Sequence, residues 1–107
     1  MEKVAARWLQ QQGCRILEMQ YRTKGGEVDL IYEDGDELVF AEVKYRTSQE
    51  YGMPAEAVDA RKQQHIIRGA TVYAKLHQRL NDPMRFDVIE LLEQGGTLYI
   101  RQIRAAF

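Results

Sequence analysis

The chain has 107 residues, 45% of them hydrophobic and 29% charged, which is the size and composition of one globular domain spanning residues 1–107. Its 15 basic and 16 acidic residues give a net charge of −1, which disfavours a protein that coats nucleic acid by bulk electrostatics. Because it has no long apolar run, no signal segment and only one cysteine, the sequence predicts a cytoplasmic protein without membrane contact, disulfide or cysteine-based zinc site.

The first half of the chain predicts one helix and three strands. Residues 2–12 have apolar side chains at helical spacing, and Gly13 is a stop signal. Residues 15–20 fit a short strand, and the paired glycines of 22–26 favour a mobile basic loop. Two further strands are expected over 27–33 and 36–46. Asp34-Gly35 between them indicates a two-residue hairpin turn.

The second half predicts a long helix and two more strands. An irregular segment over 47–53 leads to Pro54, which suits the first turn of a helix that runs to about Leu80. Strands are expected over 85–92 and 97–103, on either side of a glycine pair. The resulting order α-β-β-β-α-β-β predicts an α/β sandwich, with a mixed central sheet flanked by helices.

Strand alternation predicts a cluster of charged side chains on one face of the hairpin. Counting outward from an Asp34-Gly35 turn places Glu27 opposite Glu42, with Asp29 as a diagonal neighbour of Glu42. One face then carries Glu27, Asp29, Ile31, Leu38, Phe40, Glu42 and Lys44, and the other carries Val28, Leu30, Tyr32, Val39, Ala41 and Val43. The first face is apolar at one end and acidic at the other, which is typical of a site at the edge of a core.

The acidic end of this face predicts a cation site. Carboxylates near a half-buried surface repel one another and raise each other's pKa unless a cation holds them. Mg²⁺ accepts one or two carboxylates and keeps waters and phosphate oxygens as its other ligands. Lys44 could hold a water or a phosphate, and Gln63 lies on the inward stripe of the second helix. We therefore expect Mg²⁺, with Mn²⁺ as a substitute.

These motifs resemble a known superfamily of nucleases. Gly26-Glu27-Val28-Asp29-Leu30-Ile31, followed by Glu42-Val43-Lys44, is similar to the Asp…Glu-x-Lys core of the PD-(D/E)xK nucleases. More closely, the chain resembles the YraN-like bacterial proteins, whose fold is like that of Holliday-junction resolvases. This likeness extends to Val39-Phe40-Ala41, Ala57-Val58, Lys62-Gln63, Arg85-Phe86-Asp87-Val88 and Ala106-Phe107.

The resemblance implies a fold, an activity and a set of site residues. The fold would be a restriction-endonuclease-like three-layer sandwich, and the activity that of a metal-dependent endonuclease, a hydrolase acting on DNA phosphodiester bonds at branched or distorted structures. Asp29 and Glu42 would bind the metal with the Val43 carbonyl, and Lys44 would position the water. Glu2 matches the acidic residue that many members contribute from the first helix, and Gln63 matches a polar position on the helix after the core. Junction-cutting relatives act as dimers, which implies a homodimer.

Several alternatives stay open. The chain could be a nucleic-acid-binding or protein-interaction module with little hydrolysis, or its acidic face could meet a basic partner. Gln63 could instead make a helix-to-loop hydrogen bond, and Asp87 is expected to be structural, as an ion pair or loop clamp. Trp8 and Cys14 are expected in the core. The candidates for nucleic-acid contact are Arg22, Lys24, Tyr45, Arg46 and Lys62, of which Arg22 and Lys24 could instead be ordinary loop charges.

Overall fold

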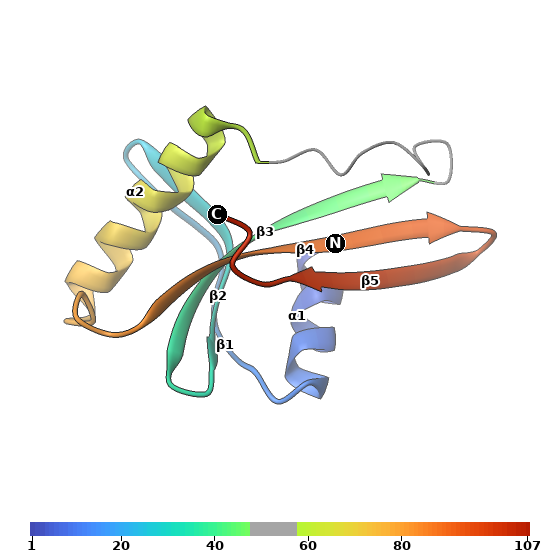
Figure 1. The fold of residues 1–107 in the computed structure, drawn as a ribbon, viewed down its shortest axis with the longest axis horizontal. Coiled ribbons are helices and arrows are strands. Elements are labelled where there is room, and N and C mark those ends of the chain that lie inside the picture. Colours follow the sequence, from blue (N-terminus) through green and yellow to red (C-terminus); the bar gives the residue numbers. More distant parts are fainter. Residues whose placement is uncertain (48–57) are drawn as a thin grey trace.

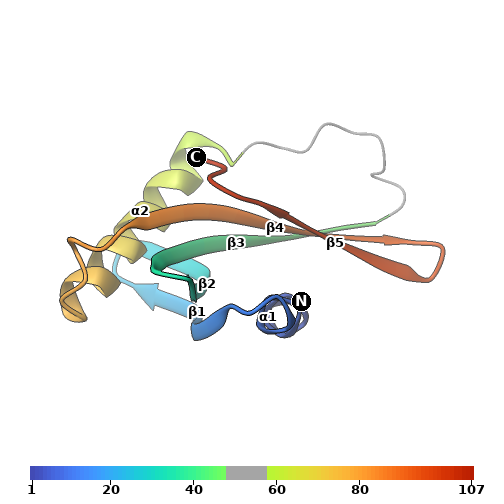
Figure 2. The same ribbon diagram turned by 60° about the horizontal axis from the view of Figure 1, so that its bottom comes forward.

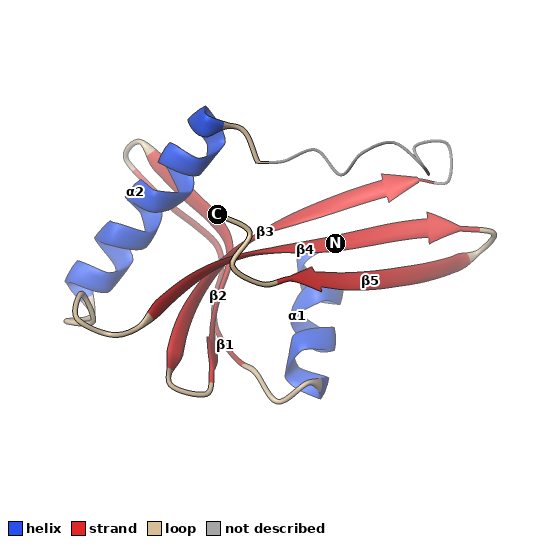
Figure 3. Cartoon of the chain, in the orientation of Figure 1, coloured by secondary structure: helices blue, strands red, loops and turns tan. Residues whose placement is uncertain are grey.

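A computed structural model describes residues 1–47 and 58–107 of the chain. Two helices and five strands follow one another in the predicted order, as Figures 1 and 3 show. They are α1 (Glu2–Gln11), β1 (Arg15–Thr23), β2 (Gly26–Asp34), β3 (Glu37–Thr47), α2 (Ala60–Leu76), β4 (Met84–Gln94) and β5 (Thr97–Ile103). The strands form one mixed sheet in the order β1-β2-β3-β4-β5, in which only β3 and β4 are parallel. The α/β class and the mixed sheet are therefore confirmed.

The two helices cover opposite faces of the sheet. One cluster of buried side chains joins Ala5 and Leu9 of α1 to one face, with Leu30, Ala41 and Ile89 at its centre. A second cluster joins the inner face of α2 to the other side of the sheet. Figure 2 shows α1 beneath β3 and β4, whereas α2 crosses the end of the sheet on the other side. Within residues 1–47 and 58–107, neither helix is long and apolar enough to cross a membrane.

The turn of the β2–β3 hairpin lies one residue later than the sequence predicts. Asp34 pairs with Glu37, so the two loop residues are Gly35 and Asp36. Gly35 has a φ of +63°, and a positive φ at the first loop position is what the favoured two-residue hairpin turns require. The predicted pairing of Glu33 with Asp36 is therefore wrong. The partner of each β2 residue moves by two positions along β3, so the apolar side chains of β3 keep their predicted faces.

The alternation of β2 breaks at Asp29, which the sequence pattern does not predict. Leu30 packs in the α1 cluster as expected, but Val28 packs in the α2 cluster instead of joining it. Opposite Asp29, between the pairs Met19–Leu30 and Tyr21–Val28, Gln20 has a φ of +51°. A non-glycine residue in this region is uncommon and marks a local distortion of the strand. Asp29 therefore lies at a kink.

The bounds of β1 and α2 differ most from the predictions. β1 continues to Thr23, so the expected loop over 22–26 is reduced to a turn at Lys24-Gly25. α2 begins at Ala60, because Asp59 caps its first turn by accepting a hydrogen bond from Lys62 N at 2.8 Å, and it ends at Leu76 instead of near Leu80. The predicted helix start at Pro54 and most of the segment 47–53 lie outside the described residues.

Asp87 has the structural role expected of it. Its side chain is fully buried and accepts hydrogen bonds from Tyr32, Arg85 and Gln102. The Ala105 amide donates to the same carboxylate at 3.0 Å, which fastens the C-terminal turn to β4. A buried carboxylate is tolerated when paired in this way.

Candidate metal site at the fork between β2 and β3

The candidate site lies where β2 and β3 separate. Their last paired residues are Leu30 and Ala41, and Figure 1 shows the two strands diverging beyond this point. The Val43 amide, past the end of the paired segment, donates to Asp29 Oδ2 at 2.8 Å. The kink at Asp29 thus turns its carboxylate toward the backbone of β3, where it replaces a main-chain acceptor.

Asp29 is held in an environment that disfavours its charge. Burial raises the pKa of its carboxyl group, and the negative charges of Glu2 and Glu27 add to this rise. The hydrogen bond from Val43 and the positive charge of Lys62 act in the opposite direction, but the net shift is upward. A nearby cation would favour the ionised form.

Glu42 is the second carboxylate of the site. Burial raises its pKa, and the charge of Asp29 raises it further, whereas Lys62 and Lys44 lower it. Its Oε2 atom is buried and has no hydrogen-bond partner among the described residues. A buried carboxylate oxygen without a partner is costly, so this atom points to a missing electropositive ligand. Asp29 and Glu42, which the sequence predicts to converge, lie close enough at the fork for the charge of one to act on the other.

Lys62 lies among the carboxylates. From the first turn of α2, its Nζ contacts Glu27 Oε1 at 2.8 Å and Glu42 Oε1 at 3.5 Å. This pairing lowers the pKa of Glu27 and raises that of Lys62 itself. The sequence places Lys62 as a contact for nucleic acid, and the structure places its ammonium inside the candidate site.

The remaining predicted site residues surround this centre. Glu2, at the start of α1, is close enough for its charge to act on Asp29. Lys44 lies two residues beyond Glu42 on β3, and its charge lowers the pKa of Glu42. Gln63 donates from Nε2 to the Val58 carbonyl at 2.8 Å, which is the helix-to-loop hydrogen bond of the alternative interpretation.

The other candidates for nucleic-acid contact are spread along two strands. Arg22, on β1, lies 4.0 Å from Glu27, and Lys24 is exposed in the turn that follows. Tyr45 and Arg46 lie further along β3. The Tyr45 hydroxyl donates to Glu93, and Arg46 contacts Glu90 at 3.4 Å; Figure 1 shows that this part of β3 runs away from α2.

The donor set of the site suits a hard cation with an incomplete protein shell. Within residues 1–47 and 58–107, no group of three or more His, Cys, Asp and Glu side chains is arranged to hold a metal ion. The two carboxylates Asp29 and Glu42 match Mg²⁺, because it needs only one or two carboxylates and keeps waters and substrate phosphates as ligands. The unpartnered Oε2 of Glu42 supports this fit. Zn²⁺, which prefers nitrogen and sulfur ligands, does not fit.

Two features of the site are not predicted by the sequence analysis. Gln20, whose left-handed backbone lies opposite the kink, has no mark in the sequence, because glutamine gives no turn signal. The inward direction of Lys62 depends on where α2 begins. Its place three residues after Asp59, a favoured N-cap type, is the one signal that could have shown it.

The model of the uncharacterised protein family UPF0102 matches residues 1–91. UPF0102 proteins from Anaeromyxobacter dehalogenans and Alkaliphilus metalliredigens are 42% and 44% identical over 106 residues, which cover 99% of this chain and 79% and 92% of theirs. A UPF0102 protein from Caldanaerobacter subterraneus is 46% identical over 102 residues, 95% of this chain and 84% of its own length. The chain therefore belongs to the uncharacterised protein family UPF0102.

Proposed function

We propose that this protein is a Mg²⁺-dependent endonuclease that hydrolyses DNA phosphodiester bonds at branched or distorted structures. One observation carries the proposal. Glu42 has a buried oxygen without a partner among the described residues, and it lies beside a second carboxylate, Asp29, with a raised pKa. Such a pair is unfavourable when empty and favourable around a divalent cation. The Asp…Glu-x-Lys resemblance, and the sandwich fold that it implies, support the same proposal.

Each residue at the fork would have a distinct task. Asp29 and Glu42 would hold the cation with the Val43 carbonyl, while the Val43 amide keeps the Asp29 carboxylate turned toward β3. When bound, Mg²⁺ polarises the phosphate and makes a water molecule more acidic. Lys44 would stabilise the charge that develops on the attacking oxygen and the phosphorus centre.

Lys62 would contribute in a different way. It bonds the carboxylates of Glu27 and Glu42, so it balances part of the negative charge of the site. A divalent cation beside Glu42 would repel this ammonium, which would then be available to a phosphate of the DNA. This preserves the predicted role of Lys62 in nucleic-acid contact and ties it to metal binding.

The same contact favours a second candidate function. Because Lys62 already neutralises charge at the site, the protein could bind nucleic acid with little or no hydrolysis. The two candidates differ in turnover, not in fold. A module of this kind would bind branched DNA and leave it intact.

Cleavage assays decide between them. The purified protein, with Mg²⁺ or Mn²⁺, is incubated with single-stranded, duplex and four-way-junction DNA. We expect the protein to cleave DNA and Asp29→Asn to abolish the cleavage. Asp36→Asn is the control and should preserve it, because it is the same substitution at an exposed position of the hairpin turn. Binding of DNA without cleavage would favour the module. Because symmetric cleavage of a junction needs two sites, we also infer a homodimer, which sedimentation of the protein with junction DNA would detect.

A further inference from the structure

The outer flank of α1 combines positive charge with an aromatic ring. Lys3 and Arg7 are exposed and one helical turn apart, so they are neighbours on the helix surface. Neither has an ion pair with any described residue, in contrast to Arg79 and Arg85, which are each bonded to carboxylates. Trp8, expected in the core, is only partly buried and packs at the edge of the α1 cluster. Two cations without an ion pair among the described residues thus line the same cavity as a partly accessible ring.

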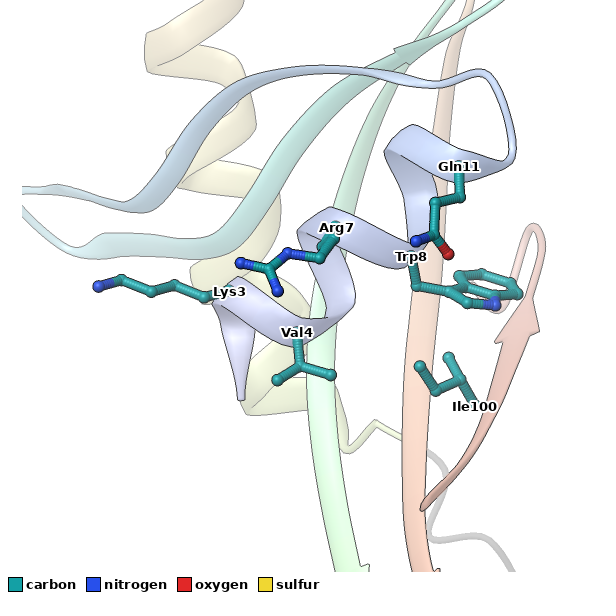
Figure 4. Close-up of a pocket in the computed structure, with 6 residues that line it drawn as sticks. All are labelled: Lys3, Val4, Arg7, Trp8, Gln11 and Ile100. Atoms are coloured by element: carbon teal, nitrogen blue, oxygen red, sulfur yellow. The ribbon is translucent and has the colours of Figure 1, made fainter. Parts of the chain in front are cut away.

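These side chains border shallow cavities on both sides of the helix. A cavity of about 240 Å³ between α1 and β5 is lined by Lys3, Val4, Arg7, Trp8, Gln11 and Ile100. Figure 4 shows the ring of Trp8 beside Ile100, with Arg7 and Lys3 extending from the adjoining flank of the helix. Lys3 and Arg7 also line a second cavity, of about 220 Å³, toward β1.

The cavities lead toward the candidate metal site. A third, of about 340 Å³, shares Lys3 and Met19 with the second and is also lined by Met1, Glu2 and Gln20. Gln20 lies opposite Asp29 in the sheet, and the charge of Glu2 acts on Asp29. A polymer that follows Arg7 and then Lys3 would therefore arrive beside the first carboxylate of the fork.

We propose that this flank of α1 is a binding site for single-stranded nucleic acid, in which Lys3 and Arg7 hold phosphates and Trp8 stacks on a base. Single-strand binding surfaces combine these two features, because cations follow the backbone and aromatic rings accept any base. An acidic peptide could use the charges but not the ring in this way. The inference rests on the proposed function only for the direction in which the strand leads, namely toward Asp29.

Binding can be measured apart from hydrolysis. Trp8 is the only tryptophan, so its fluorescence reports the site directly. A short oligothymidylate is titrated into the whole protein in the presence of EDTA, and binding is followed by Trp8 quenching and by anisotropy of a labelled oligonucleotide. We expect quenching on binding. Lys3→Gln and Arg7→Gln should each reduce the slope of log affinity against log salt by about 0.7, the value for one phosphate contact on a single strand.

The controls separate this site from other surfaces. Lys75→Gln removes an exposed charge, which has no ion pair with any described residue, from the far end of α2 and should leave the slope unchanged. Trp8→Phe retains a ring and should bind more tightly than Trp8→Leu, provided that both unfold like the wild type. Absence of oligonucleotide binding, binding without quenching, an Arg7→Gln slope equal to that of wild type, or tighter binding of polyglutamate would each overturn the proposal. Failure of cleavage with intact quenching would contradict only the proposed function.

Discussion

Gly26 of β2 lies directly against Gly69 of α2. A Cβ atom added to Gly26 would lie 2.5 Å from the Gly69 backbone nitrogen, and one added to Gly69 would lie 2.9 Å from Val28 Cγ2 and 3.3 Å from the Glu27 nitrogen. Glycine in a helix interior costs about 1 kcal/mol relative to alanine, so this glycine has a packing reason. The contact sets how closely α2 approaches the strand that carries Glu27 and Asp29.

This contact predicts that Gly69→Ala destabilises the protein, although it improves helix propensity. Overpacking of this kind costs about 1–3 kcal/mol, and Gly26→Ala should cost more because it meets backbone. Urea unfolding measures both. Thr71→Ala, at an exposed position of the same helix, should leave stability unchanged or raise it. Gly69→Ala at or above wild-type stability would show that the helix can move away.

The carboxylates of the fork should matter for metal and not for folding. Glu42→Gln and Asp29→Asn remove charge but keep an oxygen, which at Asp29 can still accept from Val43. Because loss of even an outer-shell group costs about 10–100-fold in metal affinity, each variant should weaken Mg²⁺ at least that much, measured by calorimetry.

Without metal, the stability of the same variants should hold or rise at neutral pH. The folded pKa of both groups is raised, so their cost is absent at low pH and develops as pH rises above the unfolded value of about 4. Thermal unfolding in EDTA tests this. Equal destabilisation with and without metal would make the two carboxylates structural.

Lys62→Met should increase affinity for Mg²⁺. Its ammonium lies 3.5 Å from Glu42 Oε1, where it repels an incoming cation. Relief of about 1.4 kcal/mol of repulsion corresponds to a tenfold tighter site. Arg61→Met, which removes an exposed neighbouring charge, is the matched control and should change affinity little. Weaker Mg²⁺ binding by Lys62→Met would mean that Lys62 organises the carboxylates and does not compete with the metal.

Asp87→Asn should lower the stability of the protein more than any substitution at the fork. Removal of one partner from a buried ion pair costs about 3–5 kcal/mol, whereas Asp82→Asn, which breaks a partly exposed pair with Arg79, should cost under about 1 kcal/mol. Although burial raises the pKa of Asp87, hydrogen bonds from Arg85 and Tyr32 outweigh it and lower the pKa overall.

The sign of this shift fixes a pH dependence. A lowered folded pKa gives stability that is complete above the unfolded value of about 3.9 and is lost as pH falls through the folded one. Urea unfolding below about pH 4 should therefore weaken the wild type and affect Asp87→Asn less. Parallel acid profiles for the two proteins would place the acid-sensitive group elsewhere.

The order of elements could be predicted from the sequence because each rests on local signals. Helical spacing identified α1, and glycine turns identified the hairpins. The faces of β3 also held, with Phe40 toward α2 and Ala41 toward α1, because alternation depends only on the strand itself. The turn lies one residue later than predicted, but this moves the pairing by two positions, so each side chain stays on the same face of the strand.

The geometry of the site was harder to predict because it departs from regular structure. The kink at Asp29 changes the side on which Val28 packs, and it forms opposite the left-handed Gln20, so no property of β2 alone indicates it. The sequence predicts Lys62 only as a contact for nucleic acid, because charge alone does not show which carboxylates a lysine faces. Its place depends on the approach of α2 to β2, which two glycines distant in the sequence set together.

Lys44 is the residue that best separates a nuclease from a binding module. It lies two residues past Glu42 on β3, and its charge reaches that carboxylate. If the protein cleaves DNA, Lys44→Met should lower turnover by about 100- to 1,000-fold, the usual cost of removing a donor to developing charge. Mg²⁺ affinity should not fall, because both carboxylates remain. Single-turnover cleavage at saturating DNA measures the first effect and calorimetry the second.

Two further variants make this test specific. Lys44→Arg keeps the charge but replaces a compact ammonium with a planar guanidinium, so it should rescue cleavage only in part. Arg46→Gln removes a cation two residues further along β3, where it contacts Glu90, and should weaken DNA binding without slowing cleavage at saturation. In a binding module, Lys44→Met and Arg46→Gln would act alike, changing only affinity and its salt dependence. A Lys44→Met protein that cuts at the wild-type rate would reject the mechanism, because another group, such as Lys62 beside Glu42, would then stabilise the charge that develops on the phosphate.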